Sequence, residues 1–137
     1  MAPKVFLDTS FAIALSFPRD ELHPRALQIA ETMVQQKTLV VTTRAVMLEI
    51  GNSLAGQRDR AAAADMLDQL DNDQAVEVVS LTDGLFRQAS ELFRKRADKS
   101  WSLTDCVSFV VMEQMQLVEA LTADHHFVQA GFTALLI

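Results

Sequence analysis

Residues 4–10, Lys-Val-Phe-Leu-Asp-Thr-Ser, decide how the rest of the chain is interpreted. The mostly apolar run at 4–7 predicts a buried strand, and the Asp8-Thr9-Ser10 that follows predicts the start of a helix. A strand that is apolar on both faces is typical of a parallel sheet covered by helices on both sides. Asp8 would then lie at the carboxyl end of this strand, where open parallel sheets usually bind ligands.

The rest of the chain alternates short β-rich runs with longer helical stretches. Further strands are expected at about 39–41, 75–81, 118–121 and 133–136. Helices are expected at about 8–17, 23–34, 43–50, 58–70, 83–97, 102–115 and 124–130. This alternation implies crossover connections between parallel strands. It predicts an α/β fold, namely a three-layer α/β/α sandwich with a mostly parallel central sheet.

Length and charge limit the possible classes of protein. The chain has 137 residues, no internal repeat and no low-complexity tract, so we expect a single domain over 1–137. Its 12 basic and 18 acidic residues give a formal net charge of −6. That charge argues against a protein that holds nucleic acid by bulk charge, unless bound divalent cations invert the potential locally.

The single cysteine and the N-terminal sequence bear on location. Cys106 excludes an internal disulfide framework, is expected to be a small buried residue, and fits a reducing cytoplasm. The first apolar run meets Asp8 too early to be the core of a signal peptide. No uncharged apolar run approaches the roughly 20 residues of a membrane span. We therefore expect a cytoplasmic protein without a membrane segment.

Four carboxylates from separate segments are candidate site residues: Asp8, Glu49, Asp105 and Asp124. Each also has an ordinary structural explanation. Asp8 and Asp124 follow strands and can cap helices, while Glu49 can lie on the one solvated stripe of its helix. Asp105 stands three residues after Ser102, as in a capping box. The helix after Asp105 is apolar nearly all round, however, so this acid is expected to point into the fold or a cleft.

If these four carboxylates meet, they form an all-oxygen site. Mg²⁺ or Mn²⁺ matches such a site, whereas zinc favours histidine and cysteine. The corresponding chemistry is metal-assisted hydrolysis of a phosphodiester, in which an attacking water is activated and the leaving oxygen is neutralised.

The chain resembles the PIN-domain ribonucleases and, among them, the VapC-type toxins of bacterial toxin–antitoxin pairs. The segments that carry the resemblance are Val5–Ser10, Met47–Ile50, Ser102–Phe109, Leu121–Phe127 and Ala130–Phe132. The resemblance implies a PIN-like fold, Mg²⁺- or Mn²⁺-dependent endonuclease activity on RNA, a homodimer, and inhibition by a cognate antitoxin that inserts into the active-site groove.

The resemblance also implies roles for individual residues. Asp8, Glu49, Asp105 and Asp124 correspond to the metal-binding catalytic acids, and Thr9, Thr104 and Thr122 correspond to hydroxyls near the site. One departure concerns the position two residues after the fourth acid. Some family members have a further acid there, whereas this chain has His126. How much of the last metal position is built therefore stays open.

Other polar and aromatic residues have two interpretations each. Arg94, Arg96 and Trp101 can contact RNA by phosphate binding and base stacking, or they form a solvated helix end with Trp101 packed as an anchor. Arg44 can reach a phosphate or pair with a carboxylate. His125 and His126 can assist proton transfer, but a surface role is the favoured interpretation.

Two other functions are compatible with parts of this pattern. One is a PIN-like module that binds RNA or a partner protein without cutting it. The other is a haloacid-dehalogenase-like phosphatase with Asp8 as the nucleophile. The phosphatase is disfavoured because Ser10 stands where that pattern requires a second aspartate, and because no well-placed lysine is evident.

Overall fold

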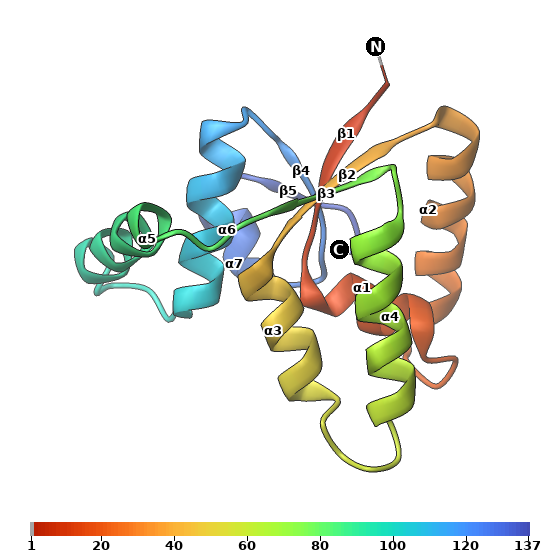
Figure 1. The fold of residues 1–137 in the computed structure, drawn as a ribbon. Helices are drawn as coiled ribbons and strands as arrows, with labels where there is room; N and C mark the ends of the chain where they lie inside the picture. Colours follow the sequence, from red (N-terminus) through yellow and green to blue (C-terminus); the bar gives the residue numbers. More distant parts are fainter. Residues whose placement is uncertain (1) are drawn as a thin grey trace.

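A computed structural model describes residues 2–137, and its strands all belong to one parallel sheet. The strand order is β3-β2-β1-β4-β5, so β1 lies at the centre (Figure 1). The strands are β1 (Lys4–Leu7), β2 (Leu39–Thr43), β3 (Val76–Val79), β4 (Glu119–Leu121) and β5 (Thr133–Ala134). Because all strands point the same way, their carboxyl ends share one edge, where β1 leads into the first helix.

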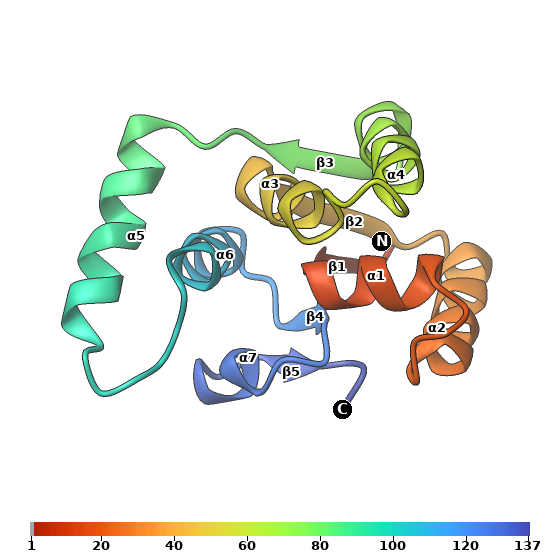
Figure 2. The same cartoon turned by 90° about the horizontal axis from the view of Figure 1, so that it is seen from below.

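Helices cover both faces of this sheet. They are α1 (Thr9–Ser16), α2 (His23–Gln36), α3 (Arg44–Ser53), α4 (Arg60–Asn72), α5 (Asp83–Lys95), α6 (Leu103–Gln114) and α7 (His125–Gln129). Figure 2 shows α1, α2 and α4 on one side and α6 and α7 on the other, with α5 outside α6. At the carboxyl edge α3 contacts α1, α4 and α6. The predicted three-layer sandwich is confirmed, and its sheet is parallel throughout.

Local sequence explains where two functionally important helices begin. Thr43 caps α3, because its side-chain oxygen accepts a hydrogen bond from the Val46 amide at 3.0 Å. Ser102 and Asp105 form the predicted capping box at the start of α6. These caps fix the register of the two helices that carry Glu49 and Asp105.

A row of aromatic side chains connects the central strand to the start of α6. Phe6 of β1 contacts Phe127 of α7, which packs edge-on against Phe109 of α6 with ring centroids 5.0 Å apart. Phe109 in turn packs edge-on against Trp101 at 4.9 Å. Burying such a side chain stabilises the fold by roughly 1.5–3 kcal/mol. This row fixes the position of the Ser102–Asp105 turn relative to the sheet.

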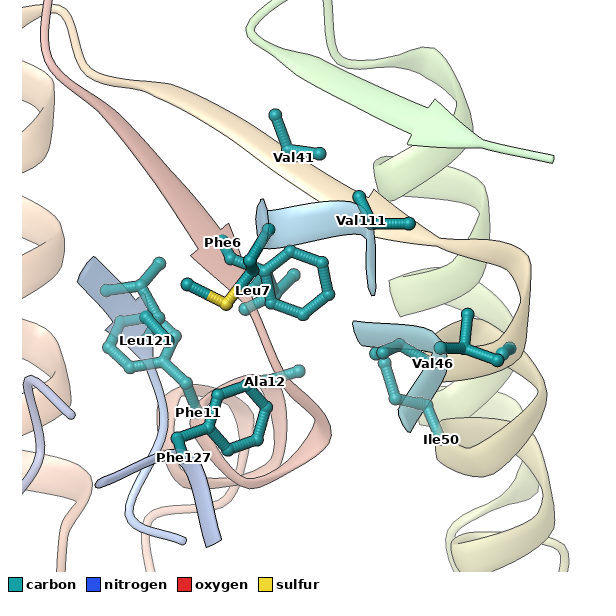
Figure 3. Close-up of a cluster of buried hydrophobic side chains, with 14 of the residues drawn as sticks. Phe6, Leu7, Phe11, Ala12, Val41, Val46, Ile50, Val111, Leu121 and Phe127 are labelled. Carbon is teal, nitrogen blue, oxygen red and sulfur yellow. The ribbon is translucent and has the colours of Figure 1, made fainter. Parts of the chain in front are cut away.

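The apolar core lies directly behind the carboxyl edge. Figure 3 shows Phe6, Leu7, Val41 and Leu121 of the strands packed with side chains of the surrounding helices. Phe6 and Val41 are completely buried. Polar groups at the ends of these strands are therefore attached to a rigid base. Within residues 2–137 no helix is both long enough and apolar enough to span a bilayer.

Candidate active site

The first acid is positioned by the pairing of the two central strands. Leu7 of β1 is in register with Leu121 of β4, and the Asp8 amide donates to the Leu121 carbonyl at 3.2 Å. One residue further, the Thr122 hydroxyl donates to Asp8 Oδ2 at 2.7 Å. Asp8 and Thr122 are both buried. The end of β1 is thereby joined to the segment that leads to the fourth acid.

Two hydroxyls extend this connection. The Thr122 hydroxyl accepts a hydrogen bond from the Asp124 amide at 3.0 Å and lies 3.2 Å from the Ser10 hydroxyl oxygen. Ser10 Oγ also accepts from the Ala123 amide at 3.0 Å. Sequence reasoning did not assign Ser10 to the site. Its place in the turn directly after Asp8 was the available signal.

The second acid reaches the site from α3. Glu49 is partly exposed, and its Oε1 accepts a short hydrogen bond from the Thr9 hydroxyl at the start of α1. Because Thr9 directly follows Asp8, this hydrogen bond draws Glu49 toward the end of β1. The prediction that Thr9 and Thr122 lie near the acids agrees with these contacts.

The third acid serves as a helix cap and as part of the cluster. Asp105 Oδ2 accepts from the Ser102 amide at 3.1 Å, and the Asp105 amide donates to Ser102 Oγ at 3.0 Å. The same Oδ2 lies 2.9 Å from Nδ1 of His126. The side chain of Asp105 is only 9% exposed. The capping-box explanation and the expectation of an inward-pointing acid are therefore both correct.

Asp124 and His126 complete the cluster. Asp124 Oδ1 accepts from the His126 amide at 2.9 Å and so caps α7. His126 Nδ1 lies 3.5 Å from Asp124 Oδ1, and ligand atoms of Asp105, Asp124 and His126 lie within 4.8 Å of one another. The favoured surface role for His126 is wrong. The tight turn from Asp124 into α7 directs the imidazole back over the capping carboxylate and onto Asp105.

Electrostatics set Asp8 apart from an ordinary surface acid. Burial raises the pKa of Asp8 from 3.8 to about 6. The hydrogen bond from Thr122 opposes this rise, while the negative charges of Glu49 and Asp105 add to it. The charges of these three acids are therefore close enough to interact.

In the part of the chain that the structure describes, the cluster has no lysine or arginine partner to neutralise its acids. Within residues 2–137, the ion pairs of arginine and lysine involve Asp71 and Asp98 and none of the four candidate acids. Several carboxylates held together without such a partner are unfavourable unless a cation joins them. Carboxylate oxygens are the donors that Mg²⁺ and Mn²⁺ prefer. The donor set therefore fits a divalent cation.

Thr104 has a different place from the other two threonines. It lies with Glu49 on the wall of an open groove between α3, α5 and α6, whose apolar lining includes Leu48 and Phe86. Within the described part of the chain, its hydroxyl makes no hydrogen bond to the four acids. Thr104 thus borders the approach to the acids and does not orient them.

The structure also distinguishes among the candidate RNA contacts. Trp101 is 6% exposed, its indole N–H donates to Gln129 Oε1 at 3.0 Å, and Arg96 lies over its ring at 4.9 Å. Of the two interpretations, the structure therefore agrees with Trp101 as a packed anchor, and so buried a ring has no free face for a base. Arg44 pairs with Asp71 at 2.7 Å, whereas Arg94 is exposed.

Comparison with known proteins gives concordant results. The profile of the family described as PIN domain matches residues 5–133. The "23S rRNA-specific endonuclease VapC20" of two Mycobacterium tuberculosis strains is 30% identical over 131 residues, which cover 93% of this chain and 95% of the relative. The crystal structure of M. tuberculosis VapC20, described as a Sarcin-Ricin loop cleaving toxin, has a TM-score of 0.84 and 27% identity, covering 94% of this chain and 96% of that one.

A more distant structure shares the fold alone. VapBC2 from Rickettsia felis, solved with a DNA fragment from its promoter, has a TM-score of 0.68 and 11% identity. The superposition covers 96% of this chain and 96% of that one.

Proposed function

We propose that this chain, which belongs to the PIN-domain family, is a metal-dependent endoribonuclease and the toxin of a toxin–antitoxin pair. One observation carries the proposal. Asp8, Glu49, Asp105 and Asp124 come from four separate segments and meet at the carboxyl edge of the sheet, and no lysine or arginine of residues 2–137 pairs with them. The relative named as an rRNA-specific endonuclease supports RNA as the substrate.

The four acids would hold Mg²⁺ or Mn²⁺ between them. When bound, such a cation supplies positive charge that stabilises the attacking and leaving oxygens of a phosphodiester under hydrolysis. The chain contributes precise orientation of the carboxylates. Thr122 holds Asp8, Thr9 holds Glu49, and the α6 capping box holds Asp105 before any substrate arrives. Such preorganisation keeps the reacting groups aligned.

We infer that the RNA approaches along the groove between α3, α5 and α6. Glu49 and Thr104 stand on its wall, so a strand lying there would reach the acids. Of the three arginines predicted to contact RNA, Arg44 and Arg96 already pair with aspartates, whereas Arg94 is exposed on α5 and has no ion pair within residues 2–137. The proposal includes a cognate antitoxin protein, a homodimer and a cytoplasmic location.

Cleavage assays with purified protein test this function. Wild-type protein, Asp8→Asn and Asp105→Asn are incubated with ribosomal RNA in Mg²⁺, in Mn²⁺ and in a chelator. We expect cleavage only with a divalent ion, and a loss on the order of a thousandfold in each variant, because a bound cation supplies several kcal/mol of transition-state stabilisation. Asp68→Asn, at an exposed position of α4, is the matched control and should cleave normally.

Growth of a bacterium that expresses the chain alone gives a second readout. Toxicity should be lost in Asp105→Asn while circular dichroism and thermal unfolding show a retained fold. Cleavage that survives in both aspartate variants would remove the argument from the acids. A wild-type protein that neither cleaves RNA nor slows growth would favour the non-catalytic binding module instead. Light scattering of the purified chain tests the homodimer.

A further inference from the structure

His126 stands among the acids in a way that a helix cap does not require. Asp124 already caps α7 through the His126 backbone amide, yet the imidazole also turns back toward the cluster. Its Nδ1 lies 2.9 Å from Asp105 Oδ2 and 3.5 Å from Asp124 Oδ1. The neighbouring His125, by contrast, is exposed.

The two carboxylates that face this imidazole each keep one oxygen free. Within residues 2–137, the hydrogen bonds to the Asp105 carboxylate end on Oδ2 and those to the Asp124 carboxylate end on Oδ1. Asp105 Oδ1 and Asp124 Oδ2 therefore have no protein partner in this part of the chain. The three side chains offer ligand atoms within 4.8 Å of one another. Adjacent ligands around a six-coordinate divalent ion lie about 3 Å apart, so small side-chain rotations suffice to place all three on one ion.

We propose that His126 is a nitrogen ligand of the divalent cation, beside Asp105 and Asp124, and that it makes this site favour Mn²⁺ over Mg²⁺. The inference rests on the proposed function, because it assigns a ligand to the same cation. Mg²⁺ is a hard ion that takes oxygen ligands. Mn²⁺ also suits carboxylates, but as a first-row transition ion it accepts an imidazole nitrogen more readily than Mg²⁺ does. An all-carboxylate cluster lacks this source of selectivity.

Direct binding measurements test the assignment without any RNA. Wild-type protein containing ¹⁵N-labelled histidine is loaded with Mn²⁺ and examined by pulsed electron paramagnetic resonance. We expect a nitrogen coupling in the wild type and its loss in His126→Asp. Calorimetric titrations with Mn²⁺ and Mg²⁺ should show that His126→Asp lowers the ratio of the two affinities by roughly tenfold.

His125→Asp is the matched control, since it makes the same chemical change one residue away on the solvent side. It should keep both the nitrogen coupling and the wild-type affinity ratio. Bound Mn²⁺ without nitrogen coupling in the wild type would overturn the inference, as would an unchanged ratio in His126→Asp. The proposed nuclease would survive either result if cleavage still depended on Asp8 and Asp105. Absence of Mn²⁺ and Mg²⁺ binding at millimolar concentration, with no RNA cleavage, would overturn both proposals.

Discussion

Charged residues gather in two regions of this protein, which differ in how far the charges are buried and in which groups they contact. In the α5–α6 connection the charges remain partly in solvent and pair with a neighbour in the sequence: Arg96 pairs with Asp98 at 3.0 Å, and Lys99 lies 3.8 Å from the same carboxylate. At the carboxyl edge of the sheet, Asp8 and Asp105 are buried and their partners are hydroxyls, backbone amides and one histidine.

The difference shows that local charge density is a poor guide to a functional site. The basic cluster of Arg94, Lys95, Arg96 and Lys99 is conspicuous in the sequence, yet two of its cations, Arg96 and Lys99, already share the nearby Asp98. The acids are up to 116 positions apart in the printed sequence, from Asp8 to Asp124. Once they meet, no lysine or arginine among the described residues pairs with them. A bound cation responds to the charge that remains after folding, and burial strengthens that response.

The largest effect on stability is expected at Trp101, which belongs to the basic region by sequence and to the core by structure. Trp101→Ala removes a buried ring that packs edge-on against Phe109 and donates a hydrogen bond to Gln129. We expect the free energy of unfolding to fall by about 3–5 kcal/mol, as measured by urea denaturation. Trp101→Phe keeps most of the packing but loses the hydrogen bond to Gln129, so its free energy of unfolding should fall by about 1 kcal/mol. Equal stability of all three proteins would return Trp101 to the list of RNA contacts.

In the metal-free protein, replacing Asp8 should raise the free energy of unfolding at neutral pH, a smaller effect than that at Trp101 and opposite in sign. The folded-state pKa of about 6 exceeds the unfolded value of 3.8, so the protonated form is favoured by folding. The stability that Asp8 contributes is fully present below pH 3.8 and is lost as the pH rises through 6. The Asp8→Asn variant cannot ionise. Between pH 4 and pH 7 its free energy of unfolding should therefore rise relative to that of the wild type, by up to about 3 kcal/mol.

Urea denaturation in a chelator across this pH range measures the difference between the two proteins. Comparing the variant with the wild type cancels the titration of groups that do not interact with Asp8. Mg²⁺ or Mn²⁺ should reverse the difference above pH 6, because a ligand that binds only the folded state stabilises it. A difference that does not change with pH would contradict the buried, charge-repelled setting of Asp8.

The smallest effect is expected on RNA binding, from changes in the basic region around Arg94 and Arg96. Arg94 is exposed and has no ion pair within residues 2–137, whereas Arg96 is occupied by Asp98 and the Trp101 ring. Arg94→Gln should weaken RNA binding a few-fold and reduce the slope of log affinity against log salt by about 0.7–1. Arg96→Gln should change that slope less. Filter-binding assays with a cleavage-deficient variant measure both, and a larger change for Arg96 would contradict this ranking.

Much of the fold was predictable because its determinants are local. Buried strands followed by capped helices gave the element order, the parallel sheet and the capping box of Ser102 and Asp105. Asp8 and Asp124 each follow a predicted strand, and this placed both at the carboxyl edge, since parallel strands align their carboxyl ends. That the two strands are neighbours became clear only from the sheet. Strand β3 ends at Val79, two residues before the predicted limit, because Ser80 and Leu81 leave the sheet toward α5.

The sequence by itself therefore determined the layers, the helix starts and the four candidate acids. Only the tertiary structure decided that Ser10 joins the hydroxyl network, that Trp101 is buried and that His126 faces Asp105. The physical reason is that each of these depends on a contact between segments far apart in the chain or on the direction of one side chain. Hydrophobic periodicity and capping patterns report on neighbours along the sequence, whereas a partner 21 residues away, as for His126 and Asp105, becomes a neighbour only through packing.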